Sequence, residues 1–314
     1  MRMTVGWPSA ATEIAAPRGA TEVCSIDCPW DATVSEADGY RYRTISFLSD
    51  YGLTDEFVGV CHGVILRLAP EVRIIDISHG IHPQNVSQGA MVLAQAVPYM
   101  PTGVHMAIVD PGVGSGRLAV LVQTADGSCL VGPDNGLLIP AVSRLGGATA
   151  CRRLQNPRLM SPKPSRTFHG RDVFSPAAAY LARGVEPQEF GDLVPVTDLV
   201  PFQLPAPRLH NGHYHAVVQH VDRFGSLELN VSPAQASELG LTVGALVEVG
   251  VEGHRCLAPF GETFASVAPG ELVVVEDSHG LLAVAVNRGD AAERLGAGLG
   301  SKVVVGPAGS GAGH

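Results

Sequence analysis

Three aspartates follow apolar segments of the sequence, at positions where strands would end. Asp50 closes FLSD, Asp110 closes AIVD and Asp134 follows VGP. Because ligands of open α/β sheets bind beyond the carboxyl ends of the strands, these side chains are candidates for one shared site. Each aspartate alone fits ordinary turn chemistry equally well. The three together favour a shared site.

Asp50 would have a specific use in such a site. One carboxylate can accept hydrogen bonds from two adjacent hydroxyl groups, which suits the diol of a ribose. Asp55 lies a short distance further along the chain, before an expected helix. It is either the N-cap of that helix or a partner for a ligand ammonium group, and the two roles are compatible.

The segment TFHGRDVFSPAAAYL places a histidine just before a helix of small residues. His169, which stands beside a glycine, is the best candidate in the chain for a general base or a group that positions water. A purely structural interpretation is also open. In that interpretation Asp172 or Ser175 caps the helix, and Arg171 pairs with a neighbouring acid. The segment taken alone favours the structural interpretation.

Two further polar segments stand near the C-terminal end of the chain. HVDRFGSL contains Asp222 and Phe224 on an expected hairpin, and EDSHGLLAVAVNRG contains Ser278, Asn287 and Arg288. Simple turns also explain both segments.

Composition narrows the class of ligand. The formal charge of -9 and the pI of about 5.7 provide no broad cationic surface, which argues against nucleic acid and anionic membrane as partners. A small molecule is the expected ligand. No apolar run approaches the roughly 20 residues that cross a bilayer, and the first residues lack the apolar core of a signal peptide. We therefore expect a cytoplasmic protein.

The cysteines and histidines form no complete metal-binding pattern. Of the six cysteines, only Cys24 and Cys28 are close enough in sequence for half of a zinc site. His213 and His215 come nearest to a histidine pair and are expected to mark one face of a strand. The P-loop, GxGxxG, GxSxG and CxxC motifs are missing from the sequence. We expect no cofactor and no metal, and the isolated thiols suit a reducing compartment.

The elements that would position these residues alternate between strand and helix from Thr44 onward. Such alternation predicts an α/β domain with a mostly parallel central sheet, over residues 44–192. Asn85 or Ser87 is the expected N-cap of its second helix. The expected strands are 45–49, 72–78, 104–110, 118–124 and 129–132, and the expected helices are 55–68, 86–99, 136–146 and a segment after 172.

The pattern changes after residue 192. The segment LVPVTDLVPFQLPAPRLHNG carries four prolines and no helical period, which predicts a linker at 193–210. Short β-rich runs separated by glycines follow and predict an all-β, barrel-like domain over 211–305. Residues 1–43 are expected to be a partly ordered extension, and 306–314 a flexible tail. At 314 residues and 46% hydrophobic, the chain is long enough for two domains.

Seven segments, in order, resemble one known family. They are FLSDYG, PEVRIIDISHGIHPQNVSQGA, VDPGVG, VGPDNG, FHGRDVF, DRFG and AVNRG. Over about residues 44–305 the chain resembles the S-adenosyl-L-methionine (SAM) hydrolases, also called SAM hydroxide adenosyltransferases, whose relatives are the fluorinase and the chlorinase. The resemblance implies an α/β N-terminal domain, a β-barrel-like C-terminal domain and a homotrimer with active sites between subunits.

The resemblance also implies roles for particular residues. The triad that activates water falls on Asp110, Arg117 and His169. Asp50 corresponds to the residue that holds the ribose hydroxyls, Asp55 and Asp222 to those that meet the methionine ammonium, and Ser278 to the one that meets the methionine carboxylate. Phe224 corresponds to an aromatic that packs against adenine, and the backbone near Arg288 to a contact with the adenine edge. Ser226 stands where the family has asparagine in DRFGN, which implies a weaker or water-mediated adenine contact.

The implied activity is hydrolysis of SAM to adenosine and L-methionine, by attack of one activated water on ribose C5′. A SAM-dependent halogenase and a non-catalytic binder of SAM or adenosine are the alternatives. A carboxylate at Asp110 about 4 Å from a halide would cost on the order of 4 kcal/mol at an effective dielectric of about 20, which disfavours halogenation. An intact triad argues against a protein that only binds.

Overall fold

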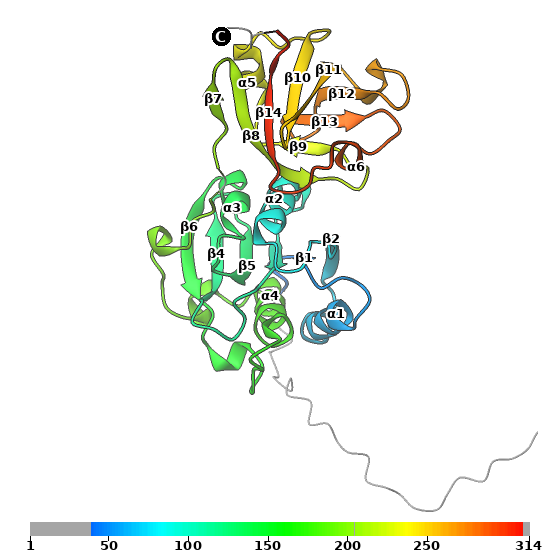
Figure 1. Cartoon of the computed structure of the whole chain (residues 1–314). Helices are drawn as coiled ribbons and strands as arrows, with labels where there is room; N and C mark the ends of the chain where they lie inside the picture. The colour runs from blue at the N-terminus through cyan, green and yellow to red at the C-terminus, as the bar shows by residue number, and fades with distance from the viewer. Residues whose placement is uncertain (1–38, 204, 310–314) are drawn as a thin grey trace, which may run out of the picture. The chain divides into compact units, whose positions relative to one another are not determined.

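The computed structural model describes residues 39–203 and 205–309. Cys24, Cys28, most of the predicted N-terminal extension and the end of the predicted tail lie outside the described residues. The described chain contains two sheets, built from β1–β6 and from β7–β14 (Figure 1). They form an α/β N-terminal domain and an antiparallel, barrel-like C-terminal domain, so the fold class expected from the sequence is confirmed.

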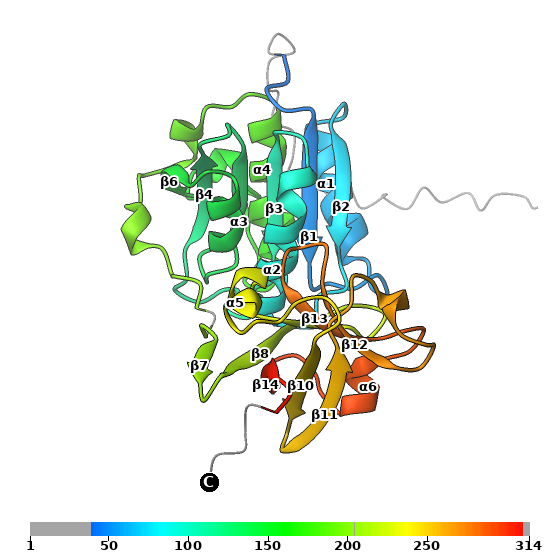
Figure 2. The same ribbon diagram turned by 90° about the horizontal axis from the view of Figure 1, so that it is seen from above.

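The N-terminal sheet has the strand order β2-β1-β3-β5-β4-β6 (Figure 2). Its β2–β1, β1–β3 and β3–β5 pairs are parallel, whereas β4 pairs antiparallel with both β5 and β6. The parallel strands bring their carboxyl ends to one edge of the sheet. The strands are β1 (Thr44–Ser49), β2 (Arg73–Ser78), β3 (Val104–Ile108), β4 (Ala119–Thr124), β5 (Cys129–Pro133) and β6 (Ala148–Arg153).

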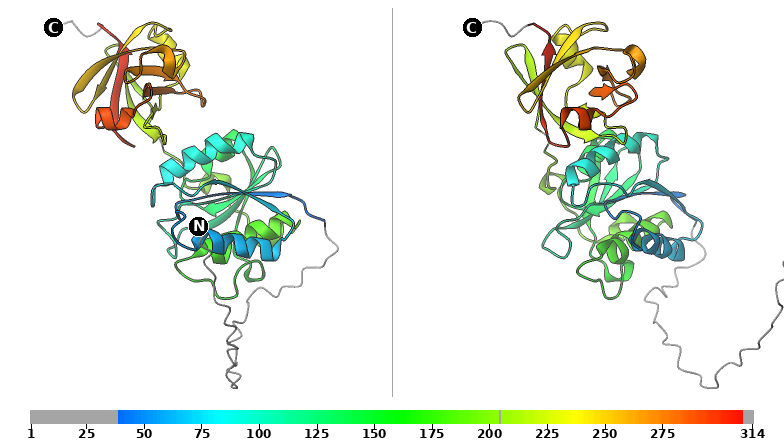
Figure 3. Two further views of the ribbon diagram at one scale, coloured as in Figure 1. Left: turned by 90° about the vertical axis from the view of Figure 1, so that its right-hand side faces the viewer. Right: turned by 45° about the vertical axis from the view of Figure 1, so that its right-hand side comes forward.

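Helices cover both faces of this sheet (Figure 3). Helices α1 (Phe57–Leu68) and α4 (Ser175–Ala182) pack together on one face, and α2 (Val86–Ala96) and α3 (Ile139–Arg144) pack together on the other. Every residue of β3 is buried, as is usual for a parallel strand between two helical layers. Asn85, one of the two caps that the sequence predicts, caps α2 by accepting a hydrogen bond from the Gln88 amide at 2.9 Å.

The boundaries of several N-terminal elements differ from the expected ones. The second helix is α-helical only to Ala96 and continues as a 3₁₀ turn over Val97–Tyr99, because Pro98 has no amide hydrogen to donate. The expected helix at 136–146 is reduced to α3, and the strand expected at 104–110 ends at Ile108. Strand β6 was not expected, since its sequence ATACRR lacks an apolar run.

The C-terminal sheet has the strand order β11-β10-β14-β8-β9-β13-β12, and β7 adds to β8. All its strand pairs are antiparallel, and a bridge between Phe260 and Val274 joins the two ends of this path. The sheet is therefore nearly closed. Its strands are β7 (Arg208–His210), β8 (His213–Val221), β9 (Leu227–Leu229), β10 (Leu246–Val251), β11 (His254–Pro259), β12 (Leu272–Glu276), β13 (Leu282–Val286) and β14 (Lys302–Pro307).

Alternating side chains fill the interior of the C-terminal sheet. On β10, Val247, Val249 and Val251 are buried, whereas the residues between them are not, which is the period of a strand with one face in a core. Two short helices that the sequence did not lead us to expect, α5 (Pro233–Glu238) and α6 (Ala291–Leu295), lie in the connections. Within the described residues, no helix is both long and apolar enough to span a membrane.

Candidate functional site

Three side chains predicted to act together meet beside the carboxyl end of β3. Arg117 donates from Nε to Oδ1 of Asp110 at 2.9 Å, and its Nη2 group contacts the other carboxylate oxygen. The same Nη2 lies 2.8 Å from Nδ1 of His169. The side chains of Arg117 and Asp110 are only 10% and 6% exposed, so this ion pair is shielded from water. We call Asp110, Arg117 and His169 the Arg117 cluster.

Three chain segments converge to build the Arg117 cluster. Asp110 begins the turn after β3, Arg117 ends the same loop before β4, and His169 precedes a π-helical turn at Gly170–Phe174 that continues into α4. Gly114 has φ of +74°, and a Cβ atom there would collide with the backbone oxygen of Arg166. A glycine is therefore needed for the two loops to approach each other.

The arrangement fixes the protonation of His169. A guanidinium group has only donors, so Nδ1 of His169 must accept the hydrogen bond from Arg117. The neutral ring then carries its proton on Nε2. Burial, followed by the positive charge of Arg117, lowers the pKa of His169 below its ordinary value of 6.5. His169 is thus a neutral ring that offers an N–H donor.

Asp50 lies near this cluster. Its amide donates to the Ile108 carbonyl at 3.3 Å, which ties the end of β1 to the end of β3. Its Oδ2 accepts a hydrogen bond from the Gln84 amide at 2.7 Å. Burial raises the pKa of Asp50, and the nearby charge of Asp110 acts in the same direction. Two of the three strand-end aspartates therefore share one region.

The third strand-end aspartate has a structural role instead. Oδ1 of Asp134 accepts a hydrogen bond from the Val200 amide at 2.9 Å and holds the segment that leaves the N-terminal domain. Asp55 is exposed and has no hydrogen bond or ion pair with any residue that the structure describes. Its expected role as the N-cap of α1 is wrong, because the helix begins at Phe57 and Glu56 occupies the cap position.

One part of the structural interpretation of the HGRD segment is correct, namely the pairing of Arg171 with a neighbouring acid. Arg171 pairs with Asp172, donating from Nε at 2.7 Å, and Asp172 also accepts from the Ser165 amide. Neither Asp172 nor Ser175 caps α4, because the chain enters that helix through the π-helical turn. His169 is the exception, since it contacts Arg117.

The predicted C-terminal residues line one cavity of about 1030 Å³ in the barrel-like domain. Two hydrogen bonds of Asp222 hold the turn at the edge of this cavity. Its Oδ1 accepts from the backbone amides of Phe224 and Ser226, each at 2.8 Å. The turn interpretation of DRFG is therefore correct, and the turn also borders the cavity. Phe224 is 77% exposed, a large value for a phenylalanine. The predicted residues on the cavity wall are Asp222, Phe224, Ser226, Ser278, Asn287 and Arg288.

Several titratable residues that sequence reasoning missed also line the cavity, and three of them lie together, Glu228, Asp277 and His279, which we call the Glu228 cluster. Glu228 is buried and accepts hydrogen bonds from Gln219 at 2.7 Å and from Gln95 at 2.9 Å. His279 lies 3.1 Å from it. Burial raises the pKa of Glu228 to about 7, with Asp277 acting in the same direction. The segment EDSHG carries the only sequence signal, and it resembles a simple turn.

A second group of histidine and carboxylate side chains, His62, Asp76 and His79, lies on the N-terminal domain. It is separate from the Arg117 cluster. Sequence spacing shows no metal-binding pattern for this group, because its three residues come from α1, from β2 and from the loop after β2.

Two family models cover most of the chain. The SAM hydroxide adenosyltransferase N-terminal domain matches residues 45–191, and the SAM hydroxide adenosyltransferase C-terminal domain matches residues 216–304. A structure from Thermotoga maritima, described as an uncharacterized conserved protein, superposes with a TM-score of 0.79 at 34% identity, over 83% of this chain and 99% of that one.

Curated relatives match this chain over 96–98% of their own length. The (R)-S-adenosyl-L-methionine hydrolase of Salinispora tropica is 45% identical over 83% of this chain and 97% of its own. The (R)-S-adenosyl-L-methionine hydrolase of Thermus thermophilus is 41% identical over 81% of this chain and 96% of its own. The fluorinase of Nocardia brasiliensis is more distant, at 28% identity over 85% of this chain and 98% of its own. Two matching domain models and relatives above 40% identity place the chain in the SAM hydroxide adenosyltransferase family.

Proposed function

We propose that this protein hydrolyses SAM to adenosine and L-methionine. The observation that carries the proposal is the Arg117 cluster, in which an arginine with a largely buried side chain contacts both Asp110 and His169 beside the nucleoside-binding candidate Asp50. Its curated relatives at 41–46% identity bear the name of that activity. The fluorinases are less similar.

The reaction is a substitution at carbon. The oxygen of one water forms a bond to ribose C5′ while the C5′–S bond breaks, and its electron pair returns to the positive sulfur. Methionine leaves as a neutral thioether and needs no acid, and the water loses one proton to solvent. Holding the water in line with the C–S bond removes much of the entropic barrier, so positioning is the main task of the protein.

The protonation of His169 defines its part in that positioning. Since Nδ1 accepts from Arg117, the free Nε2–H donates to the water oxygen and orients it. In this arrangement His169 does not accept the proton of the water. Arg117 supplies positive charge that favours hydroxide character, and Asp110 fixes the guanidinium plane through two parallel bonds.

The charge of the cavity in the C-terminal domain suits SAM. Asp222, Glu228 and Asp277 lie on its wall, and a ligand with an ammonium and a sulfonium group would be attracted to these carboxyl groups. In our proposal, Asp222 and Asp55 meet the ammonium group, Ser278 the carboxylate, and Phe224 with the backbone at Arg288 the adenine. Asp50 holds the ribose.

We further propose a homotrimer in which the Arg117 cluster of one subunit faces the cavity of a neighbour. The large exposure of Phe224 supports a partner that covers it. The test mixes two inactive variants, His169→Ala and Phe224→Ala, after dissociation and reassociation. If sites are shared, subunits that each retain one intact half restore about a quarter of the parent activity. No restored activity, or a monomer with full activity in light scattering, contradicts the proposal.

We infer a cytoplasmic location. Cys61, Cys129 and Cys151 are buried free thiols, which suit a reducing compartment. Cell fractionation checks this location, and recovery of the protein outside the cytoplasm contradicts it.

Incubation of the purified protein with SAM in isotope-labelled water tests the activity directly. We expect adenosine carrying the label on its 5′ oxygen, together with L-methionine, and the same products when chloride is present. A 5′-chloro nucleoside as the main product would identify a halogenase, and no product with bound SAM would identify a binding protein. Label in any other position would contradict attack at C5′.

A further inference from the structure

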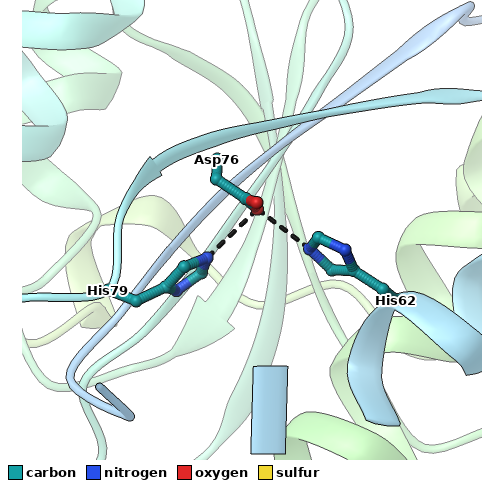
Figure 4. Close-up of side chains that lie close together, drawn as sticks. All are labelled: His62, Asp76 and His79. Carbon is teal, nitrogen blue, oxygen red and sulfur yellow. Dashed lines mark hydrogen bonds and ion pairs between the residues drawn. The ribbon is translucent and has the colours of Figure 1, made fainter. Parts of the chain in front are cut away.

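Two histidines and an aspartate converge at the edge of the N-terminal sheet, which we call the His62 cluster (Figure 4). His62 comes from α1, Asp76 from the edge strand β2, and His79 from the loop directly after β2. Nε2 of His62 lies 2.9 Å from Oδ1 of Asp76, and Nε2 of His79 lies 3.1 Å from the same oxygen. Both rings point toward the carboxylate.

These distances are close to those between the ligands of one metal ion. Zinc bonds to histidine nitrogen and carboxylate oxygen are about 2.0–2.2 Å long, so tetrahedral ligand atoms stand roughly 3.4 Å apart. Each histidine nitrogen would need to move only a few tenths of an ångström away from the Asp76 oxygen, and the three ligand atoms all lie within 4.8 Å of one another. Two imidazoles and one carboxylate are a donor set typical of divalent transition metals, whereas Mg²⁺ and Ca²⁺ prefer oxygen ligands.

His79 supplies an independent observation. The residue is only 6% exposed, and its Nε2 has no hydrogen-bond partner among the described residues, although Asp76 is near. The Asp76 oxygen is therefore close without the geometry of a hydrogen bond. A buried, unpaired ring nitrogen is costly, and a bound cation would satisfy it.

The other side of the His79 ring is already held. Nδ1 lies 2.7 Å from Oγ of Ser49, the last residue of β1. When Nδ1–H donates to this hydroxyl, Nε2 carries the lone pair and faces Asp76. Such a hydrogen bond on the far ring nitrogen is the usual support of a metal-binding histidine.

The environment leaves a route for the ion. The Asp76 and His62 side chains are 43% and 27% exposed, so water can reach the open side of the cluster. Phe47 forms the closed side, with its ring centroid 4.6 Å from that of His79. An ion here would have three protein ligands and at least one water.

We propose that His62, Asp76 and His79 bind one divalent transition-metal ion that fastens α1 to the edge strand β2. The site adds to the proposed hydrolysis and takes no part in its chemistry. It would also fix the end of β1, because Ser49 contacts His79 and is followed by Asp50. The metal would therefore stabilise the domain and the loop that carries Asp50.

Cobalt titration of the metal-stripped protein tests the proposal. The full chain is used with Cys24→Ser and Cys28→Ser, since those thiols could bind metal themselves. We expect one Co²⁺ per chain, with visible absorption from nitrogen and oxygen ligands, and displacement by Zn²⁺ but not by Mg²⁺. The melting temperature should rise with Co²⁺ concentration.

Three variants give the proposal its controls. His62→Ala and Asp76→Asn alter partly exposed side chains and should weaken Co²⁺ binding by about a hundredfold or more, since loss of an outer partner alone costs about 10–100-fold. Their melting temperature should no longer respond to Co²⁺. His210→Ala, on β7, removes a histidine outside the cluster and should bind like the parent. Equal binding by all four proteins, or no Co²⁺ uptake by the parent, would overturn the proposal.

Discussion

The Arg117 cluster and the Glu228 cluster each combine a histidine with a buried carboxyl group, but their charges are balanced differently. Arg117 pairs with both oxygens of Asp110, so the N-terminal cluster has a permanent cation for its carboxylate. Among the described residues, the partners of Glu228 are the side-chain amides of Gln219 and Gln95 together with His279, and Asp277 stands nearby. Burial, with Asp277 acting in the same direction, raises the pKa of Glu228 to about 7. A preorganised, charge-balanced group suits chemistry, whereas a cavity wall on which carboxyl groups outnumber the one arginine, Arg288, suits binding of a positive ligand.

Removing the Arg117 guanidinium should have the largest effect on kcat. Arg117→Ala leaves Asp110 unpaired and frees His169, so we expect kcat to fall by about a hundredfold or more with little change in SAM affinity. Arg117→Lys should remain slow, because one ammonium group cannot reproduce the planar contacts to both partners. Steady-state kinetics and equilibrium binding measure the two quantities. Arg144→Ala, on α3, is the matched control, and a parent-like kcat in Arg117→Ala would remove the cluster from the reaction.

The donor role of His169 can be separated from a role as base. His169→Ala should lower kcat by about a hundredfold, whereas His169→Gln keeps an N–H donor near the Nε2 position and should recover part of the loss. A general base would give equal losses in both variants.

The pH profile tests the same role of His169. Because its pKa is lowered, the neutral ring persists as the pH falls below 6.5, and the acidic loss of kcat should begin only below that value. An acidic limb above 6.5 in the parent enzyme, absent in His169→Gln, would contradict this assignment.

Substrate affinity should depend on one strand-end aspartate and not on another. Asp50→Asn should weaken SAM binding about 10- to 100-fold, since a charged hydrogen bond contributes about 1.5–3 kcal/mol. Asp134→Asn should leave affinity near that of the parent, because Asp134 holds the Val200 amide. Calorimetric titration of inactive His169→Ala carrying each change would measure this. Equal losses from both changes would remove the distinction between them.

The smallest expected effect is on folding stability and comes from the titration of Glu228. Its pKa is raised from 4.5 to about 7 on folding, so the unfolded chain releases this proton first. Stability from this group is therefore present below pH 4.5 and is lost as the pH rises to about 7. Above that, Glu228→Gln should be more stable than the parent by about 1–3 kcal/mol. Denaturation across this window measures it, with exposed Glu276→Gln as control, and parallel pH curves for parent and Glu228→Gln would contradict it.

Local sequence signals account for the elements that have strong apolar patterns. β3 is apolar except for His105, as suits a buried parallel strand, and α2 has its cap in Asn85. β6 escaped notice because ATACRR has neither an apolar run nor regular alternation. Its place is fixed by pairing with β4, which is a tertiary interaction.

The side-chain clusters depended on information that spacing alone lacks. Family resemblance suggested the members of the Arg117 cluster, but the contact from Arg117 to Nδ1 of His169, and hence the proton on Nε2, needed coordinates. The His62 cluster had no spacing signal at all, since a helix and an edge strand bring its members together. Asp134 and Asp50 have the same sequence signal, an aspartate at the end of an apolar strand. Their roles differ, because the side chain of Asp134 accepts a hydrogen bond from the Val200 amide.

The π-helical turn before α4 sets the rotational phase of His169. The Ser175 amide bonds to the Gly170 carbonyl, so this turn holds one residue more than an α-helical turn would. Each residue of an α-helix advances the side-chain direction by about 100°, and the extra residue lets His169 face Arg117 while α4 keeps its fully buried positions. Deleting one residue within 170–174 would turn the imidazole by roughly that angle away from the guanidinium. The orientation of His169 is therefore encoded in the length of a helical turn as much as in the identity of the residue.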